Sequence, residues 1–179
     1  ADTFLPTPNV EVLDLSYNPS LSFKSVVAAL NDSLPNLKYL DLCNLQTALS
    51  EPLILSKEFA MVIEKKPLIT LNVSNSRISF LDDGLTSKSI RYVNLSHTYS
   101  LWLAYSPNRN LFPSVEEIDV SNTSFPWKQP GVETLHRTWK CVPFVLSVKR
   151  VIASNLRTKE PMYLHDFRLR IPCNTISIE

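Results

Sequence analysis

Six nine-residue segments of this chain align without gaps, and this alignment constrains the fold more than any other feature of the sequence. The segments are VEVLDLSYN from Val10, LKYLDLCNL from Leu37, LITLNVSNS from Leu68, IRYVNLSHT from Ile90, VEEIDVSNT from Val115 and VKRVIASNL from Val148. Their first, fourth and sixth positions are apolar throughout. Self-similarity of this kind indicates a repeat architecture, in which each repeat buries its apolar face against its neighbours.

Each segment predicts a short parallel strand. Alternate residues of a strand point to opposite faces, so the fourth and sixth positions should face the core and the third, fifth and seventh should face outward. We expect strands at 12–16, 39–43, 70–74, 92–96, 117–121 and 150–154. The fourth-position side chains should be buried: Leu13, Leu40, Leu71, Val93, Ile118 and Val151. Prolines that precede four of the segments should mark strand entry: Pro8, Pro35, Pro67 and Pro113.

The residues after each predicted strand also follow a pattern. The seventh position is Ser in five segments and Cys43 in the second, and the eighth is Asn in four. The ninth position is Asn only at Asn18, so we expect less regular loops after the other strands. Between strands, SFKSVVAALNDSL and SKEFAMVIEKK can form helical turns, whereas AYSPNRNLF looks irregular.

The pattern LxxLxLxxN resembles the leucine-rich repeat over residues 1–160, and LDLSYNPSLSF followed by LPNLKYLDL resembles a Toll-like receptor ectodomain. The resemblance implies an α/β solenoid with a concave parallel sheet of about six strands and irregular convex loops and helical turns. It implies a non-catalytic recognition module, secreted or on the extracellular side of the plasma membrane, that binds a protein or microbial ligand. Residues 161–179 would form a terminal segment. Further repeats of the same receptor, or a second copy of the chain, are also candidate partners.

A different class of function fits the same repeats. A secreted structural or adhesion subunit could assemble end to end into a filament or matrix through its terminal apolar faces. An enzyme is not expected. The two glycines, Gly84 and Gly131, exclude a phosphate-binding loop, a dinucleotide fingerprint and a GxSxG elbow. We expect no cofactor and no metal, and no apolar run approaches the ~18 residues of a membrane span.

Modification sites follow from short motifs. Four residues begin an acceptor triplet for N-linked glycans: Asn31, Asn72, Asn94 and Asn122. The repeat itself favours Asn at the fifth position and Ser at the seventh, which accounts for two of the triplets, but we expect Asn72 or Asn94 to be glycosylated. Cys141 and Cys173 bracket the last irregular stretch and are either one disulfide or two buried thiols. Cys43 is then left free or bonded to another chain.

Candidate contact residues fall in three groups. With glycans at both Asn72 and Asn94, the contact surface should shift to a flank or to the loop aromatics Tyr99, Trp102 and Tyr105, and we expect a flank or loop contact. With neither occupied, Tyr39 and Tyr92 become the better anchors, beside a polar ladder at the fifth position that reads as a solvated strand face. The basic end of the chain is either scattered solubilising charge or a patch for an anionic partner, made by Arg150, Arg157, Lys159, Arg168 and Arg170.

Overall fold

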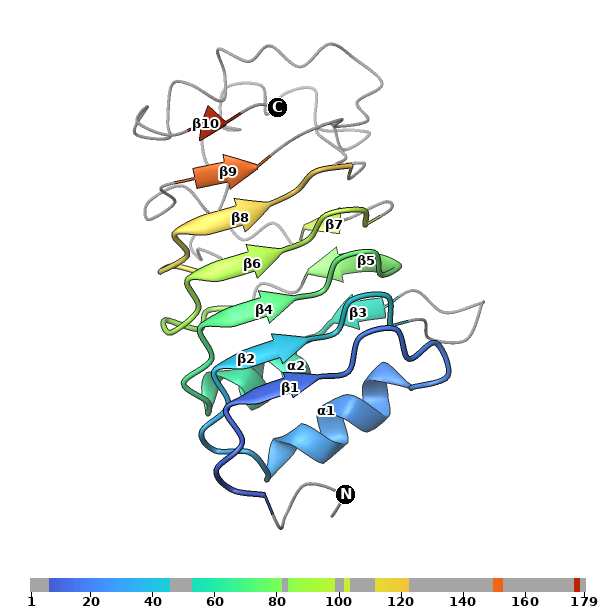
Figure 1. Cartoon of the computed structure of the whole chain (residues 1–179), viewed down its shortest axis with the longest axis vertical. Helices are drawn as coiled ribbons and strands as arrows, with labels where there is room; N and C mark the ends of the chain where they lie inside the picture. The colour runs from blue at the N-terminus through green and yellow to red at the C-terminus, as the bar shows by residue number, and fades with distance from the viewer. Residues whose placement is uncertain are drawn as a thin grey trace.

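The computed structural model describes residues 7–45, 53–81, 84–98, 102–103, 112–122, 150–152 and 176–177. Within these residues the protein is an α/β structure built on a seven-stranded parallel sheet, the main sheet, whose strands lie side by side in chain order (Figure 1). The strands are β1 Val12–Asp14, β2 Tyr39–Asp41, β4 Thr70–Asn72, β6 Tyr92–Asn94, β8 Glu117–Asp119, β9 Arg150–Ile152 and β10 Ile176–Ser177.

All six aligned segments supply a strand of the main sheet, and each strand begins at the predicted residue. The alignment is also the hydrogen-bonding register, because equivalent positions pair throughout. Leu13 pairs with Leu40, and Leu40 in turn pairs with Leu71. The strands are shorter than predicted, since they end at the fifth position and not at the seventh. Pro8, Pro35, Pro67 and Pro113 all lie shortly before a strand, as expected.

The last strand reveals a further copy of the pattern. Ile176 of β10 pairs with Val151, which occupies the fourth position of its segment. This register assigns Cys173 to the first position and Ile178 to the sixth, so CNTISI repeats the apolar spacing. These residues fall within 161–179, the stretch expected to form a separate terminal segment, yet β10 extends the main sheet.

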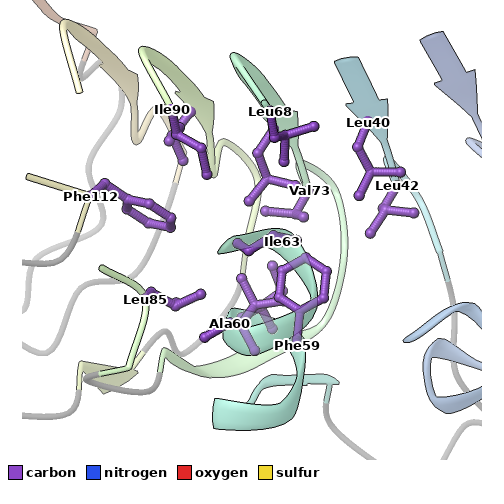
Figure 2. Close-up of a cluster of buried hydrophobic side chains, with 14 of the residues drawn as sticks. Leu40, Leu42, Phe59, Ala60, Ile63, Leu68, Val73, Leu85, Ile90 and Phe112 are labelled. Carbon is purple, nitrogen blue, oxygen red and sulfur yellow. The ribbon is translucent and has the colours of Figure 1, made fainter. Parts of the chain in front are cut away.

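Two helices, at the positions where the sequence predicted helical turns, pack on the inner side of the main sheet near its β1 end (Figure 1). They are α1, Phe23–Asn31, and α2, Lys57–Glu64. Helix α2 begins at the cap Ser56, whose hydroxyl accepts the Phe59 amide at 3.5 Å. Its buried side chains, among them Phe59, Ala60 and Ile63, face Leu40 of β2 and the sixth-position residues Leu42 and Val73 (Figure 2).

Burial of the apolar columns supplies the main stabilisation of this fold. From β2 to β8 the first, fourth and sixth positions are all at most 5% exposed. Each fully buried Leu or Val contributes about 1.5–3 kcal/mol relative to an exposed one. The phenyl rings of Phe23 and Phe59 join the two helices, with centroids 5.1 Å apart. The predicted burial of Leu40, Leu71, Val93 and Ile118 is confirmed, and Val151 has no described side chain.

The prediction for Leu13 was wrong. This side chain is only half-buried, although its counterparts in the next four strands are buried. Leu13 lies in β1, the edge strand of the main sheet, so one side of it has no strand against it among the described residues. A repeated apolar column predicts burial only where both neighbouring strands are present.

The seventh-position residues were also wrongly predicted to face outward. Ser74, Ser96 and Ser121 are buried, and Cys43 is half-buried. The reason is that the side-chain oxygen of the fifth residue accepts the amide N–H of the seventh, which ends the strand in an Asx turn. The bond measures 2.8–3.1 Å in each of the segments described here, from Ser16 to Asp14, Cys43 to Asp41, Ser74 to Asn72, Ser96 to Asn94 and Ser121 to Asp119.

The eighth-position residues take the left-handed backbone conformation. Their φ angles lie between 51° and 56°, at Tyr17, Asn44, Asn75, His97 and Asn122. Asn tolerates this region better than other residues with a Cβ, which explains why Asn recurs in this column. The chain therefore turns in the same way after each of these strands.

The ninth position also contributes hydrogen bonds to the turns that follow the strands; most of the loops expected to be less regular lie outside the described residues. Asn18 donates to the carbonyls of Leu15 and Ser16, as an Asn of the repeat consensus should. Where Asn is missing, Ser76 donates to the Leu42 carbonyl at 3.1 Å and Thr98 to the Leu95 carbonyl at 2.7 Å. A hydroxyl can thus replace the amide in satisfying loop carbonyls, and the turn is preserved.

A second parallel sheet of three short strands was not predicted. Its order is β3 Leu53–Leu55, β5 Ile78–Leu81 and β7 Trp102–Leu103. These strands are about as short as those of the main sheet, but they lie outside the aligned segments and begin at different distances from them, so the alignment does not reveal them. No helix among the described residues is both long and apolar enough to cross a membrane.

Replacing Asn75 by Ala tests the turn. Asn75 is exposed, and its side chain makes no hydrogen bond within the described part of the chain, so the substitution changes mainly the cost of its positive φ of 51°. We expect Asn75→Ala to lower the free energy of unfolding by about 1 kcal/mol, measured by urea denaturation. The matched variant Asn75→Gly should be nearly neutral. Equal losses of unfolding free energy in Asn75→Ala and Asn75→Gly would show that the position does not select residues for the left-handed backbone conformation.

Candidate recognition surface

The outer side of the main sheet presents two rows of side chains, which together we call the sheet face. The third positions of the first five strands form one row: Val12, Tyr39, Thr70, Tyr92 and Glu117. The fifth positions form the other: Asp14, Asp41, Asn72, Asn94 and Asp119. All ten residues are exposed or half-buried, because the buried core lies on the opposite side of the sheet. The polar ladder predicted at the fifth position is therefore present on this face.

The two predicted tyrosines lie close to each other on this face. Tyr39 and Tyr92 belong to β2 and β6, with Thr70 of β4 between them in register. Two strand spacings separate their backbones by about 10 Å. Tyr92 is 45% exposed and Tyr39 is half-buried. A partner could contact both rings at once, since the spacing lies well within one protein interface.

Tyr39 is held in place by a polar network. Its hydroxyl donates to Asp41 Oδ2 at 3.1 Å, and Asn72 Nδ2 donates to the same oxygen at 2.9 Å. The other carboxylate oxygen, Oδ1, accepts the Cys43 amide. Burial, and then the Asp41 carboxylate, raise the pKa of Tyr39 above 10.0. The phenol thus remains a protonated donor at physiological pH.

Ion pairs border the sheet face at the second positions of its strands. Lys38 Nζ lies 2.6 Å from Glu11 Oε1, and Arg91 Nε lies 3.6 Å from Glu116 Oε1.

Hydrogen bonds from the hydroxyl and amide of Ser16 lower the pKa of the exposed Asp14 carboxyl. Asp14, Asp41 and Asp119 are therefore acceptors within the strand-end turns, in addition to bearing negative charge.

The predicted glycan acceptors differ in how their amide nitrogens are used. Asn31, which ends α1, donates to Asp32 and accepts from Lys65. The side-chain nitrogen of Asn72 donates to Asp41, and its side-chain oxygen accepts the Ser74 amide. The Nδ2 of Asn122 lies 3.3 Å from His97 Nε2. Asn94 accepts the Ser96 amide, and its nitrogen has no partner within the described residues.

Several predicted site residues lie wholly or partly outside the described residues. Those without description are Cys141, Cys173, Tyr99, Tyr105, Arg157, Lys159, Arg168 and Arg170. Trp102 begins β7, and Arg150 begins β9, where it pairs in register with Glu117. Cys43 is a free thiol. The described parts of the chain contain no group of three or more His, Cys, Asp or Glu side chains that could hold a metal ion.

Lys66 is a buried polar residue that sequence reasoning missed. Its ammonium donates to the carbonyls of Ser33 and Leu34 in the turn after α1, and the residue is 5% exposed. Burial and the nearby Lys65 lower the pKa of Lys66, while Asp32 opposes the shift. Lys66, in the turn after α2, is therefore connected by hydrogen bonds to the turn after α1. The sequence EKKP does not indicate this role, because lysine side chains are usually exposed to solvent.

Comparison of the chain with protein-family models, with curated proteins and with solved structures finds no match. The functional interpretation of the sheet face consequently depends on its own residues.

The polar network makes a prediction about the ionisation of Tyr39. The phenol should titrate above pH 10.0, measured as the difference in phenolate absorbance between the wild type and Tyr39→Phe. Asp41→Asn removes the negative charge, so the pKa of Tyr39 should fall but stay raised, because burial is the largest cause of the shift.

The same shift sets the direction of a stability change. The unfolded phenol ionises first as pH rises, so the contribution of Tyr39 is fully present below pH 10.0 and is lost as pH rises through the folded pKa. A pKa of Tyr39 that does not move in Asp41→Asn would contradict the hydrogen bond between the two side chains.

Proposed function

We propose that this chain is a leucine-rich repeat recognition module of the Toll-like receptor ectodomain type, secreted or displayed outside the cell, which binds a protein or microbial ligand without catalysing a reaction. The observation that supports the proposal best is the sheet face. Strands laid in chain order give each repeat one outward third-position and one outward fifth-position side chain. Such a surface changes from repeat to repeat while the buried columns stay constant, which suits recognition.

The chemistry of the sheet face favours binding. Tyrosine is enriched at interface hot spots, because its rigid ring offers a large contact area and its hydroxyl a hydrogen bond. Tyr39 is already oriented by Asp41, so little side-chain entropy is lost when a partner contacts it. One side-chain oxygen of each fifth-position residue accepts a backbone amide of the turn that follows its strand. That use of the carboxylates supports a structural role for them over acid–base chemistry.

The contact between Asn72 and Asp41 favours the sheet face over the loop aromatics as the binding surface. A glycan on Asn72 would have to leave from an amide nitrogen that is half-buried and bonded to Asp41 at 2.9 Å. We therefore propose that Asn72 is unmodified, and that Asn94 is the triplet of this face that can take a glycan. The part of the face around Tyr39 would then stay open to a partner.

One observation favours the second candidate function, a structural or adhesion subunit that assembles end to end. Apolar residues at the β1 end of the main sheet are only half-buried, including Val10, Leu13 and Leu15. An incompletely covered apolar end can associate with another chain. The oligomeric state of the purified chain, measured by sedimentation, separates an assembling subunit from a recognition module that stays monomeric.

The double variant Tyr39→Ala, Tyr92→Ala tests the recognition proposal. Partners captured from extracellular fluid by the wild-type chain should bind the double variant at least about tenfold more weakly, since a hot-spot residue contributes about 2 kcal/mol or more. Met61→Ala is the matched control, because Met61 is 54% exposed on α2, away from the sheet face. The control should bind as the wild type does.

Peptide mapping of the glycans accompanies this binding test. Intact mass before and after glycosidase treatment should place any glycan of the sheet face on Asn94 and leave Asn72 unmodified. Unchanged binding by the double variant, together with a glycan on Asn72, would move the contact surface to the loop around Tyr99 and Tyr105.

A further inference from the structure

The sheet face carries negative charge and no positive charge of its own. Its two rows contain four acidic residues and no basic one, the acidic residues being Asp14, Asp41, Glu117 and Asp119. The basic residues at its border are already used. Lys38 forms an ion pair with Glu11. Arg91 pairs with Glu116 and donates to the Ser114 carbonyl. A cationic partner is therefore attracted to this face, and an anionic one is repelled.

Two of the carboxylates, on β2 and β8, face a partner without a cation beside them. Asp41 accepts hydrogen bonds from three neutral donors, which leave its negative charge in place. Asp119 accepts the Ser121 amide through Oδ1, and its Oδ2 has no partner within the described residues. Glu117 differs from these two, because it pairs in register with Arg150 of β9.

Uncharged residues separate the two aspartates. Asn72 and Asn94 lie between them in register, so Asp41 and Asp119 are three strand spacings apart, about 14 Å. Beside this row, Tyr92 is 45% exposed, and its hydroxyl has no partner in the part of the chain that the structure describes. The face thus presents two negative points with an aromatic and polar surface between them.

The spacing of the two aspartates fits an extended chain better than a helix. In an extended chain, residues i and i+4 point to the same side and lie about 13 Å apart. In an α-helix, residues on one face recur after seven or eleven positions, which corresponds to about 10 Å or 16 Å along the axis. Neither of these distances matches the separation of about 14 Å.

On the basis of the proposed recognition function, we infer that the sheet face binds an extended basic segment of a partner protein, which crosses β2 to β8 and carries arginine or lysine at residues i and i+4 and an apolar residue at i+2. One cation lies at Asp41 and the other at Asp119, and the apolar residue packs beside Tyr92. Arginine suits both positions better than lysine, because its guanidinium can donate two parallel bonds to a carboxylate. Since the segment crosses β6 at Asn94, a glycan on that residue would block it.

Asp119→Asn tests the inference without removing the turn that follows β8. Asparagine holds the same position in β4 and β6, where its side-chain oxygen accepts the turn amide in the same way. The probe is a labelled synthetic peptide, GTRTLTRTG, whose binding to the full 179-residue chain, made without glycans, is measured by fluorescence anisotropy. We expect Asp119→Asn to bind this peptide about tenfold more weakly than the wild type. Asp41→Asn should show a similar loss.

A charge-matched control separates a local contact from the overall charge of the chain. Glu64→Gln also removes one negative charge, from the exposed end of α2, and should bind the peptide as the wild type does. A second peptide of the same composition, GTTRLRTTG, has its arginines only two residues apart and should bind about tenfold more weakly than the first. Three results would overturn the inference: no binding of the first peptide, equal binding of the two peptides, or unchanged binding by Asp119→Asn.

Partners captured from extracellular fluid distinguish a failure of this inference from a failure of the recognition function. A partner that is lost by Tyr39→Ala, Tyr92→Ala but retained by Asp119→Asn would leave the recognition surface in place and overturn the basic segment. A partner retained by both variants would contradict both proposals. Loss of the partner in both variants, together with binding of the first peptide, supports both.

Discussion

The hydrogen bond from the seventh-residue amide to the side-chain oxygen of the fifth residue ends every well-described strand of the main sheet. It closes an Asx turn, and the next residue then takes a positive φ as the chain leaves the strand. The turn has the same geometry after β1, β2, β4, β6 and β8. Each of these strands therefore ends at the equivalent residue of its segment, in register with its neighbours. The common register, the buried columns and the sheet face all depend on this repetition.

The turn also decides what the polar residues of the sheet face can do. Asp41 accepts bonds from Cys43, Tyr39 and Asn72, so a single carboxylate ends a strand, orients a ring and connects two strands. Asp41 is therefore part of the framework that holds the residues of the sheet face in place. The tyrosines, in contrast, still present ring surface to solvent. This division between structural carboxylates and exposed aromatics underlies the proposal of a recognition surface.

Much of the fold could be predicted because its signal lies in single columns of the alignment. The apolar spacing located the first residue of six strands and gave their register, and the two helical stretches were recognised from their composition. The predictions that were wrong concerned features that depend on contacts between residues of different columns or different strands. The inward seventh position follows from a side chain two residues earlier, and the half-burial of Leu13 follows from a missing neighbour. The strands of the second sheet lie outside the aligned segments and begin at different distances from them, so the alignment does not show them.

The candidate site was less predictable than the fold. Tyr39 and Tyr92 were identified because their column faces outward, but the bond from Tyr39 to Asp41 depends on rotamers that a sequence does not reveal. The same holds for Asn72, whose amide nitrogen could have been free or bonded, and for Lys66, whose burial depends on the turn after α1. One signal was readable and was missed. CNTISI repeats the apolar spacing 25 residues after Val148, which would have indicated β10.

Native-state hydrogen exchange of the seventh-residue amides tests the common turn most directly. Each of these amides is bonded to a side chain, so it depends on the turn and not on the ladder of the sheet. The account predicts strong and similar protection at Cys43, Ser74, Ser96 and Ser121, close to that of the strands. Rapid exchange at these four amides, while the strands between them remain protected, would contradict the claim that one Asx turn organises the main sheet.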